Sequence, residues 1–161
     1  KDLAYRAGPK HAQSSEKVPT DLNQIADNAI KMANANLPAR AIIKKDLKID
    51  KAISIIPGRI EQALVNLLNN AAHAVAEGGT VKVSTAIKGE LATIEIEDDG
   101  MGMDPETLNS IFTPYFTTKQ PGRGTGLGLS IVHSIIEMHD GKINVQSEKG
   151  KGSKFTIDLP L

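Results

Sequence analysis

Apolar residues in the central part of the chain recur at spacings that distinguish helices from strands. From about residue 20 to 35, and again from 57 to 75, they return every three or four positions, as in helices that bury one face. In the segments 81–87 and 92–96 they alternate with polar residues, as in strands with one buried side. The pattern therefore predicts two amphipathic helices and, after the second of them, a pair of adjacent strands.

The rest of the pattern is less regular but completes the outline. Residues 41–56 are typical of two short strands or one interrupted strand. Pro105, preceded by an aspartate, begins a short helix, and after a glycine-rich segment an almost entirely apolar helix covers about 126–139. Two closing strands are predicted near 141–147 and 153–159.

These elements predict an α/β fold. Helices that come early and midway, together with adjacent strands joined by tight turns, indicate a mixed, mostly antiparallel sheet with helices covering one face. Residues 1–19 are mixed in character and contain the helix-breaking pair Gly8-Pro9, so we interpret them as the end of an upstream element and a linker. The domain itself is expected over residues 20–161.

Composition narrows the class of protein. The 161 residues include 19 basic and 19 acidic side chains, so the net charge does not point to nucleic acid or an anionic membrane surface as a partner. There are no cysteines, which excludes disulfides, thiolate catalysis and thiolate metal sites. No apolar run approaches the roughly 20 residues that span a bilayer. We therefore expect a cytoplasmic domain without direct membrane contact, although a longer parent protein could be membrane-anchored.

Asp98 is the most informative polar residue. The alternation places it on the same face of its strand as Ala92, Ile94 and Ile96, so a face that buries aliphatic side chains ends in a carboxylate. A buried charge is costly unless it is paired or hydrogen-bonded, and a carboxylate at the mouth of a pocket could accept a hydrogen bond from a ligand amino group. The alternative is a solvated aspartate that begins a turn, since Asp-Gly follows it.

Three polar residues share one face of the helix predicted from residue 57. Asn66 and Asn70 are four residues apart and His73 is three further on, so the trio lies roughly opposite the apolar stripe. Asparagine is a mediocre helix former, and neutral carboxamide oxygens suit a Mg²⁺ ion whose other ligands are phosphate oxygens and water. A solvated polar face with an isolated histidine explains these residues, taken alone, at least as well.

Residues 122–130, GRGTGLGLS, place four glycines directly before an apolar helix. The segment is not a P-loop, because no lysine follows the last glycine, and it is not a dinucleotide-binding loop, because Gly124, Gly126 and Gly128 alternate strictly. Glycines nevertheless let the backbone approach an anion held at the positive end of the next helix. A flexible linker is the alternative, but the two leucines inside the run argue against a solvated one.

The segment between Phe112 and Gly124 has the composition of a lid. It contains hydroxyls such as that of Thr118, the cations Lys119 and Arg123, and a Pro-Gly break. A loop of a dozen residues without regular structure is usually a lid or a disordered segment. The phenylalanines could anchor a closed state while Lys119 or Arg123 reaches a terminal phosphate; a disordered surface loop is the alternative.

The order of the motifs is more specific than any one of them. Along the chain come Asn66-x-x-x-Asn70, Asp98-x-Gly100-x-Gly102, the 112–116 segment, Gly124-x-Gly126-x-Gly128 and Gly150-x-Gly152-Ser153-x-Phe155. This set closely resembles the asparagine box, first glycine box, phenylalanine box, second glycine box and closing glycine motif of the catalytic ATP-binding domain of sensor histidine kinases. The resemblance covers about residues 20–161.

The resemblance implies a two-layer α/β sandwich of the Bergerat type, with three main helices on one face of the sheet and ATP between the long helix and a lid. It implies that Asp98 binds the adenine amino group, that Asn70 with Asn66 coordinates Mg²⁺ bridging the phosphates, and that these asparagines, Lys119 and Arg123 take part in catalysis. Other nucleotide-binding positions implied by the resemblance are His73, Gly100, Gly102, Met103, Phe112, Thr118, Gly124, Thr125, Gly126, Leu127, Gly128, Leu129 and Thr156.

The implied activity is transfer of the γ-phosphoryl group of ATP to a histidine on a separate dimerisation domain, for signalling to the receiver domain of a response regulator. The implied partners are therefore ATP or ADP, that dimerisation domain and the response regulator. No His-Glu or His-Asp acceptor followed by proline is visible in the chain. Its opening, KDLAYRAG, resembles the tail of the second dimerisation helix, so we expect the acceptor histidine upstream of it.

Two other functions are compatible with part of the pattern. ATP-hydrolysing relatives of the gyrase, mismatch-repair and chaperone type share the glycine boxes but have a glutamate, the general base for water, where Asn66 stands. Asparagine cannot take a proton from water at neutral pH, which favours transfer to a partner over hydrolysis. The second alternative is a nucleotide-sensing module without catalysis.

Overall fold

The structure is a computed structural model that describes residues 16–36, 41–113 and 128–161. Its elements in chain order are β1 (Val18–Thr20), α3 (Leu22–Asn36), β2 (Ile42–Leu47), β3 (Ile53–Ile55), α4 (Pro57–Ala74), β4 (Thr80–Lys88), β5 (Leu91–Asp98), α5 (Pro105–Leu108), α6 (Gly128–Met138), β6 (Lys142–Glu148) and β7 (Gly152–Pro160). None of the helices described is both long and apolar enough to cross a membrane.

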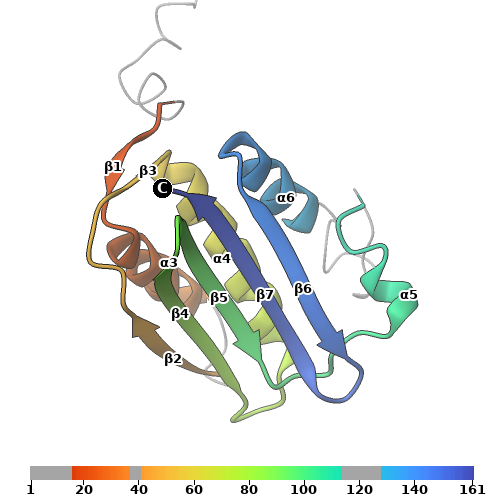
Figure 1. Ribbon diagram of the computed structural model, residues 1–161. Helices are drawn as coiled ribbons and strands as arrows, with labels where there is room; N and C mark the ends of the chain where they lie inside the picture. Colours follow the sequence, from red (N-terminus) through yellow and green to blue (C-terminus); the bar gives the residue numbers. More distant parts are fainter. Residues whose placement is uncertain (1–15, 37–40, 114–127) are drawn as a thin grey trace, which may run out of the picture.

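Two layers make up the domain. Five strands form one sheet in the order β2-β4-β5-β7-β6, and the helices α3, α4 and α6 lie together on one of its faces (Figure 1). All neighbouring strands in this sheet are antiparallel except β2, which runs parallel to β4. The mixed, mostly antiparallel sheet with three main helices on one face is therefore confirmed.

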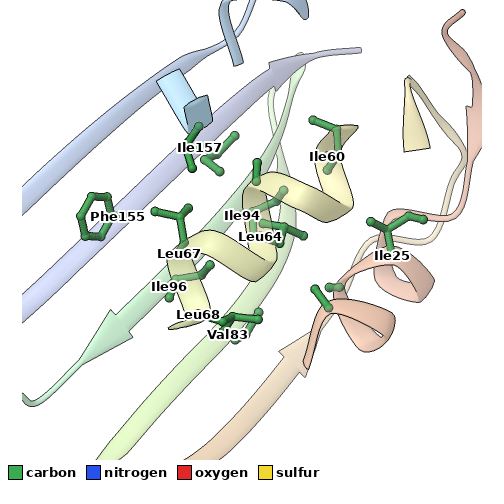
Figure 2. Close-up of a cluster of buried hydrophobic side chains, with 14 of the residues drawn as sticks. Ile25, Ile60, Leu64, Leu67, Leu68, Val83, Ile94, Ile96, Phe155 and Ile157 are labelled. Carbon is green, nitrogen blue, oxygen red and sulfur yellow. The ribbon is translucent and has the colours of Figure 1, made fainter. Parts of the chain in front are cut away.

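The core lies between the central helix and the middle of the sheet. In α4 the buried residues Ile60, Leu64, Leu67 and Leu68 are spaced as the helical pattern predicts. Their side chains point toward the apolar residues of β4, β5 and β7, and Ile25 of α3 lies at the side of the same cluster (Figure 2). Because the middle of α4 packs on the centre of the sheet, the far end of that helix reaches the edge of the sheet where β5 ends.

Local signals account for where the main helices begin. The carboxylate oxygen Oδ1 of Asp21 accepts the backbone N–H of Gln24 at 3.2 Å, which satisfies one of the free donors in the first turn of α3. Pro57 stands in the first turn of α4, where its missing N–H costs nothing. Both starts agree with the sequence prediction.

Two features of the fold were left open or missed by the sequence pattern. Residues 41–56 form two separate strands, β2 and β3, which belong to different sheets. Strand β1 was not predicted; it crosses the expected linker boundary after residue 19 and pairs antiparallel with β3. Strand β1 has only three residues, which is too few to show a periodic pattern, and its partner strand lies more than 30 positions away in the chain. The helix predicted over 126–139 is described from Gly128 onward as α6.

His139 links the end of α6 to the start of α4. Its side chain is 3% exposed; Nδ1–H donates to the carbonyl of Ile135 at 2.7 Å, and Nε2 accepts the N–H of Ile56, the N-cap residue of α4, at 3.0 Å. Nε2 can accept only while the ring is uncharged. Burial lowers the pKa of His139 and outweighs the hydrogen bond to Ile135, which raises it; Lys17 and Asp140 act in opposite directions. The fold therefore contains a neutral imidazole.

This arrangement predicts that the free energy of unfolding falls as the pH drops below 6.5. The unfolded chain takes up a proton on His139 at the ordinary pKa of 6.5, whereas the folded protein does so only at its lower native pKa. The stabilisation is fully present above 6.5 and is lost between the two pKa values. Urea unfolding between pH 8 and 5 measures the effect, and His139→Gln should flatten the profile in that window. An equally steep profile for the variant would assign the effect to another group.

Candidate functional site

A row of polar residues ends the helix-facing side of the sheet. One rung of the ladder aligns the apolar residues Val83, Ile96, Phe155 and Val145 across β4, β5, β7 and β6. Two positions along each strand, the next rung on that face aligns Val81, Asp98, Ser153 and Ser147. On β5, β7 and β6 the face that forms the core thus changes from apolar to polar within one step, at the edge where β5 ends, whereas β4 keeps the apolar Val81 there.

Asp98 is buried in this row. Its side chain is 6% exposed, and Oδ1 accepts the N–H of Gly100 at 2.8 Å. Burial raises the pKa of Asp98; the N–H groups of Gly100 and Ser153 lower it in part, and the nearby charges of Asp99 and Glu97 raise it further. No cationic side chain in the described part of the chain forms an ion pair with it. The alternative of a solvated aspartate in a turn is therefore ruled out, and the carboxylate retains acceptor capacity.

The loop after Asp98 is held by close backbone contacts at two glycines. A Cβ atom on Gly100 would overlap the carbonyl oxygen of Ala74 at the end of α4, and the N–H of Met101 donates to that same oxygen at 3.1 Å. Gly102 has φ +66°, and a Cβ there would overlap the carbonyl oxygen of Glu148. The two glycines therefore let one short loop lie against both α4 and the β6–β7 turn.

The polar face of α4 runs toward this loop. The Nδ2 group of Asn66 donates to the carbonyl of Gly128, the first residue of α6, at 3.4 Å. Asn70 lies one turn further along α4 and is half-buried. His73 is exposed, and its Nδ1–H donates to the carbonyl of Asn69 at 2.7 Å, which fixes the ring. Asn66 and Asn70 thus stand on α4 between α6 and the end of β5.

Other predicted positions surround this region. Met103, Phe112 and Leu129 are partly buried and pack against the core. The ring of Phe112 also lies against the ring of His133 on α6, with centroids 5.3 Å apart and planes tilted by 43°. The predicted positions Thr118, Lys119, Arg123, Gly124, Thr125, Gly126 and Leu127 lie outside the described residues. The lid and the roles assigned to them stay predictions.

The structure contradicts one predicted site residue. Thr156 alternates with the buried residues Phe155 and Ile157 on β7, so it lies on the opposite face of the sheet from Asp98. Its ladder partners there are Glu95 and Asn144. The assignment of Thr156 to the nucleotide site was wrong because an odd number of steps along a strand reverses the side-chain direction.

The residue of β7 that reaches Asp98 is Ser153, which was not among the predicted site residues. It is 9% exposed and lies directly opposite Asp98 in the ladder. Its position two residues before Phe155 was the available signal, because Phe155 is a core residue and Ser153 shares its face. Ser147 on β6 was also missed, although it shares a face with Val145 in the same way.

No group of three or more histidine, cysteine, aspartate or glutamate side chains that could hold a metal ion occurs in residues 16–36, 41–113 and 128–161. Neutral oxygen ligands can also hold a cation whose charge is balanced by an anionic partner. The amide oxygens of the α4 asparagines are ligands of that kind.

Comparisons with known proteins agree with this geometry. Residues 55–161 match the family described as histidine kinase-, DNA gyrase B-, and HSP90-like ATPase. Sensor histidine kinase ZraS of Escherichia coli (strain K12) is 39% identical over 143 residues, which are 88% of this chain and 30% of that protein. Sporulation kinase C of Bacillus subtilis (strain 168) is 36% identical over 143 residues, 87% of this chain and 33% of that protein. The chain thus spans about a third of the length of these relatives.

Solved structures show the same architecture. The catalytic domain of histidine kinase ThkA, which is 28% identical, superposes with a TM-score of 0.79 over 90% of this chain and 95% of that one. The expected two-layer Bergerat fold is therefore confirmed, together with the resemblance of the motifs to histidine kinase catalytic domains. The family match covers well over half of the chain, and on this evidence the protein belongs to the histidine kinase-, DNA gyrase B- and HSP90-like ATPases.

Proposed function

We propose that the domain binds ATP with Mg²⁺ and transfers the γ-phosphoryl group to a histidine on a separate dimerisation domain of its parent kinase. The observation that carries the proposal is Asp98, a carboxylate buried at the end of an apolar face with no cation to pair with in the described part of the chain. The exocyclic amino group of adenine supplies the donor that this carboxylate lacks, in a place where apolar residues can contact the base. The named relatives, a sensor histidine kinase and a sporulation kinase, support transfer over other ATP-dependent chemistry.

The residues of α4 fit a magnesium ion that arrives with the triphosphate. Asn66 and Asn70 present neutral amides on one side of the helix, and the adjacent Asn69 has a buried side-chain oxygen with no hydrogen-bond partner in the described structure. Neutral oxygen ligands suit a cation whose charge is balanced by phosphate groups. When bound, the ion would neutralise charge on the phosphates, and Asn70 with Asn66 would hold it on the α4 side of the site.

The same side chains argue against hydrolysis. Asn66 stands where a hydrolase of this family would need a base for water, and its amide nitrogen is engaged with the carbonyl of Gly128. An amide does not accept a proton at neutral pH. This domain's contribution is therefore to bind, orient and neutralise the nucleotide, while the acceptor histidine supplies the nucleophile. Lys119 and Arg123 are proposed to contact the phosphates being transferred.

The proposal includes the setting of the reaction. The acceptor lies on the dimerisation domain, the phosphoryl group then passes to the receiver domain of a response regulator, and the domain works in the cytoplasm, whether or not its parent is membrane-anchored. Neither the balanced charge of the chain nor the described surface calls for nucleic acid or lipid as a partner.

The test is phosphorylation of the separately expressed dimerisation domain of the parent kinase by this domain and radiolabelled ATP. We expect Mg²⁺-dependent labelling that is stable to base and labile to acid, as a phosphorylated histidine is. Asn70→Ala should lower the rate of labelling by roughly 10- to 100-fold, the usual effect of disturbing a metal site. Asn144→Ala, at an exposed position on β6, is the matched control and should leave the rate unchanged.

Three outcomes would count against this proposal. An Asn70→Ala rate equal to that of the parent would remove the magnesium assignment. Rapid ATP hydrolysis by the isolated domain without labelling of the histidine would favour the hydrolase alternative. Nucleotide binding without either reaction would favour the sensing module.

A further inference from the structure

The hydroxyl of Ser147 has contacts to two segments that are far apart in the chain. Its Oγ accepts the N–H of Met103 at 2.8 Å, donates to the carbonyl of Gly152 at 3.1 Å and lies 2.8 Å from Oγ of Ser153. A hydroxyl has one proton and two lone pairs. Donation to Gly152 therefore leaves both lone pairs for Met103 and Ser153, and the capacity of Ser147 is fully used.

These contacts join the loop after β5 to the start of β7. The same loop also meets the turn before β7 through backbone groups, because the N–H of Gly150 donates to the carbonyl of Met101 at 2.6 Å. Ser147 adds a side-chain bond on the other side of the loop, at Met103. The loop between Asp98 and Met103 is thus held at its far end by Ser147 and at its near end by the bond from Gly100 to Asp98.

The same network surrounds the acceptor of the proposed adenine site. Two N–H groups, those of Gly100 and Ser153, stabilise the charge on Asp98. Gly100 belongs to the loop that Ser147 holds, and the hydroxyl of Ser153 is bonded to Ser147 itself. A substitution at Ser147 is therefore expected to affect both segments that donate N–H groups to Asp98, although Ser147 does not itself contact Asp98.

We propose that Ser147 is a positioning residue of the nucleotide site: its hydroxyl keeps the 100–103 loop and the start of β7 in the arrangement that receives the base. The inference rests on the proposed ATP binding and adds to it a residue that does not contact the nucleotide. Without the hydroxyl, the N–H of Met103 loses its partner and the loop must be ordered when the nucleotide binds, which lowers affinity.

The experiment is titration of the domain with ADP and ATP by calorimetry. Ser147→Ala should raise the Kd about ten-fold. The factor should be the same for ADP and ATP and with or without Mg²⁺, because the lost contacts lie on the base side. Ser147→Thr keeps the hydroxyl and should restore affinity to within about three-fold. Ser54→Ala, at an exposed position on β3, is the control and should bind like the parent.

The outcomes separate this inference from the proposed function. A parent protein that binds neither nucleotide overturns the proposed function and this inference with it. Normal binding by the parent and an unchanged Kd for Ser147→Ala overturn the inference alone, and so does a lowered melting temperature with unchanged Kd. If Ser147→Ala does not fold, Ser147→Cys keeps the size but forms only weak hydrogen bonds, so it must show the same loss.

Discussion

Replacement of Asp98 by asparagine is expected to weaken ATP binding by roughly 10- to 100-fold. A hydrogen bond to a charged group contributes about 1.5–3 kcal/mol, and each 1.4 kcal/mol is a factor of ten in affinity. Asparagine keeps the shape of the side chain and one acceptor oxygen, but its bond to the adenine amino group is neutral and weaker.

The same substitution should not lower the stability of the nucleotide-free domain. Because the native pKa of Asp98 is raised above its ordinary value of 3.8, the protonated carboxyl contributes stability below pH 3.8, and this is lost as the pH rises through the native pKa. At pH 7 the free protein therefore holds a buried charge that burial disfavours. An uncharged asparagine removes that penalty, so we expect a free energy of unfolding equal to or above that of the parent.

Calorimetry with ATP and urea unfolding at pH 7 measure both effects on the same samples. Asp99→Asn is the matched control: Asp99 is exposed, and its Oδ1 accepts the N–H of Thr80, which an asparagine oxygen can also do. We expect the control to bind ATP like the parent. Equal affinity of Asp98→Asn and the parent for ATP would contradict the adenine assignment. A large loss of unfolding free energy in Asp98→Asn would contradict the inference that burial disfavours the charge on Asp98.

Gly152→Ala is expected to destabilise the domain strongly although it adds only one methyl group. Gly152 has φ +100°, a conformation that costs a residue with a side chain about 1–3 kcal/mol. The added Cβ would also overlap the carbonyl oxygen of Asp98 and lie 3.0 Å from Cα of Asp99. Both are backbone atoms at the end of β5, so relief requires separating β5 from β7, and such overpacking adds about 1–3 kcal/mol. Together the two costs, about 2–6 kcal/mol, are a large fraction of the total stability of a typical domain, about 5–15 kcal/mol.

The adjacent turn offers a control that separates conformation from crowding. Gly150 has φ +86°, but a Cβ there has no neighbour within 4 Å. Gly150→Ala should therefore show only the conformational penalty, about 1 kcal/mol, in urea or thermal unfolding. The difference in unfolding free energy between the two alanine variants measures the cost of placing a Cβ atom where β7 closely approaches Asp98. Similar losses of unfolding free energy in Gly152→Ala and Gly150→Ala would mean that this crowding contributes little to the destabilisation.

Much of the fold could be predicted because its signals are local. The alternation of Ala92, Ile94 and Ile96 identified the buried face of β5, and the same alternation correctly placed Asp98 on that face. The order of the motifs then indicated the Bergerat fold, which the structural neighbours confirm. Strand β1 was missed because its pairing with β3 depends on a partner far along the chain.

The site was predicted less completely because its contacts cross between strands. The Thr156 assignment came from a resemblance and ignored the side-chain direction: Thr156 directly follows the core residue Phe155, so its side chain lies on the opposite face of β7. Ser147 and Ser153 look like ordinary strand serines until the register of β5, β7 and β6 places Ser153 beside Asp98 and Ser147 beside Ser153. Nothing in the sequence distinguishes His139 from a surface histidine, because its acceptor role depends on a backbone group more than 80 residues away.

The shared ladder also restricts how chains of this architecture can diverge. Inserting one residue into the middle of β5 would turn Glu97 inward in place of Asp98 and, by the same step, expose half of that strand's aliphatic side chains. Insertions in the turn at Gly89, at the opposite end of the same hairpin, shift nothing in the rung that contains Asp98. Over evolutionary time, insertions and deletions should therefore accumulate at the Gly89 end of the sheet. At the Asp98 end, substitutions are tolerated, but the number of residues between the paired positions should stay the same.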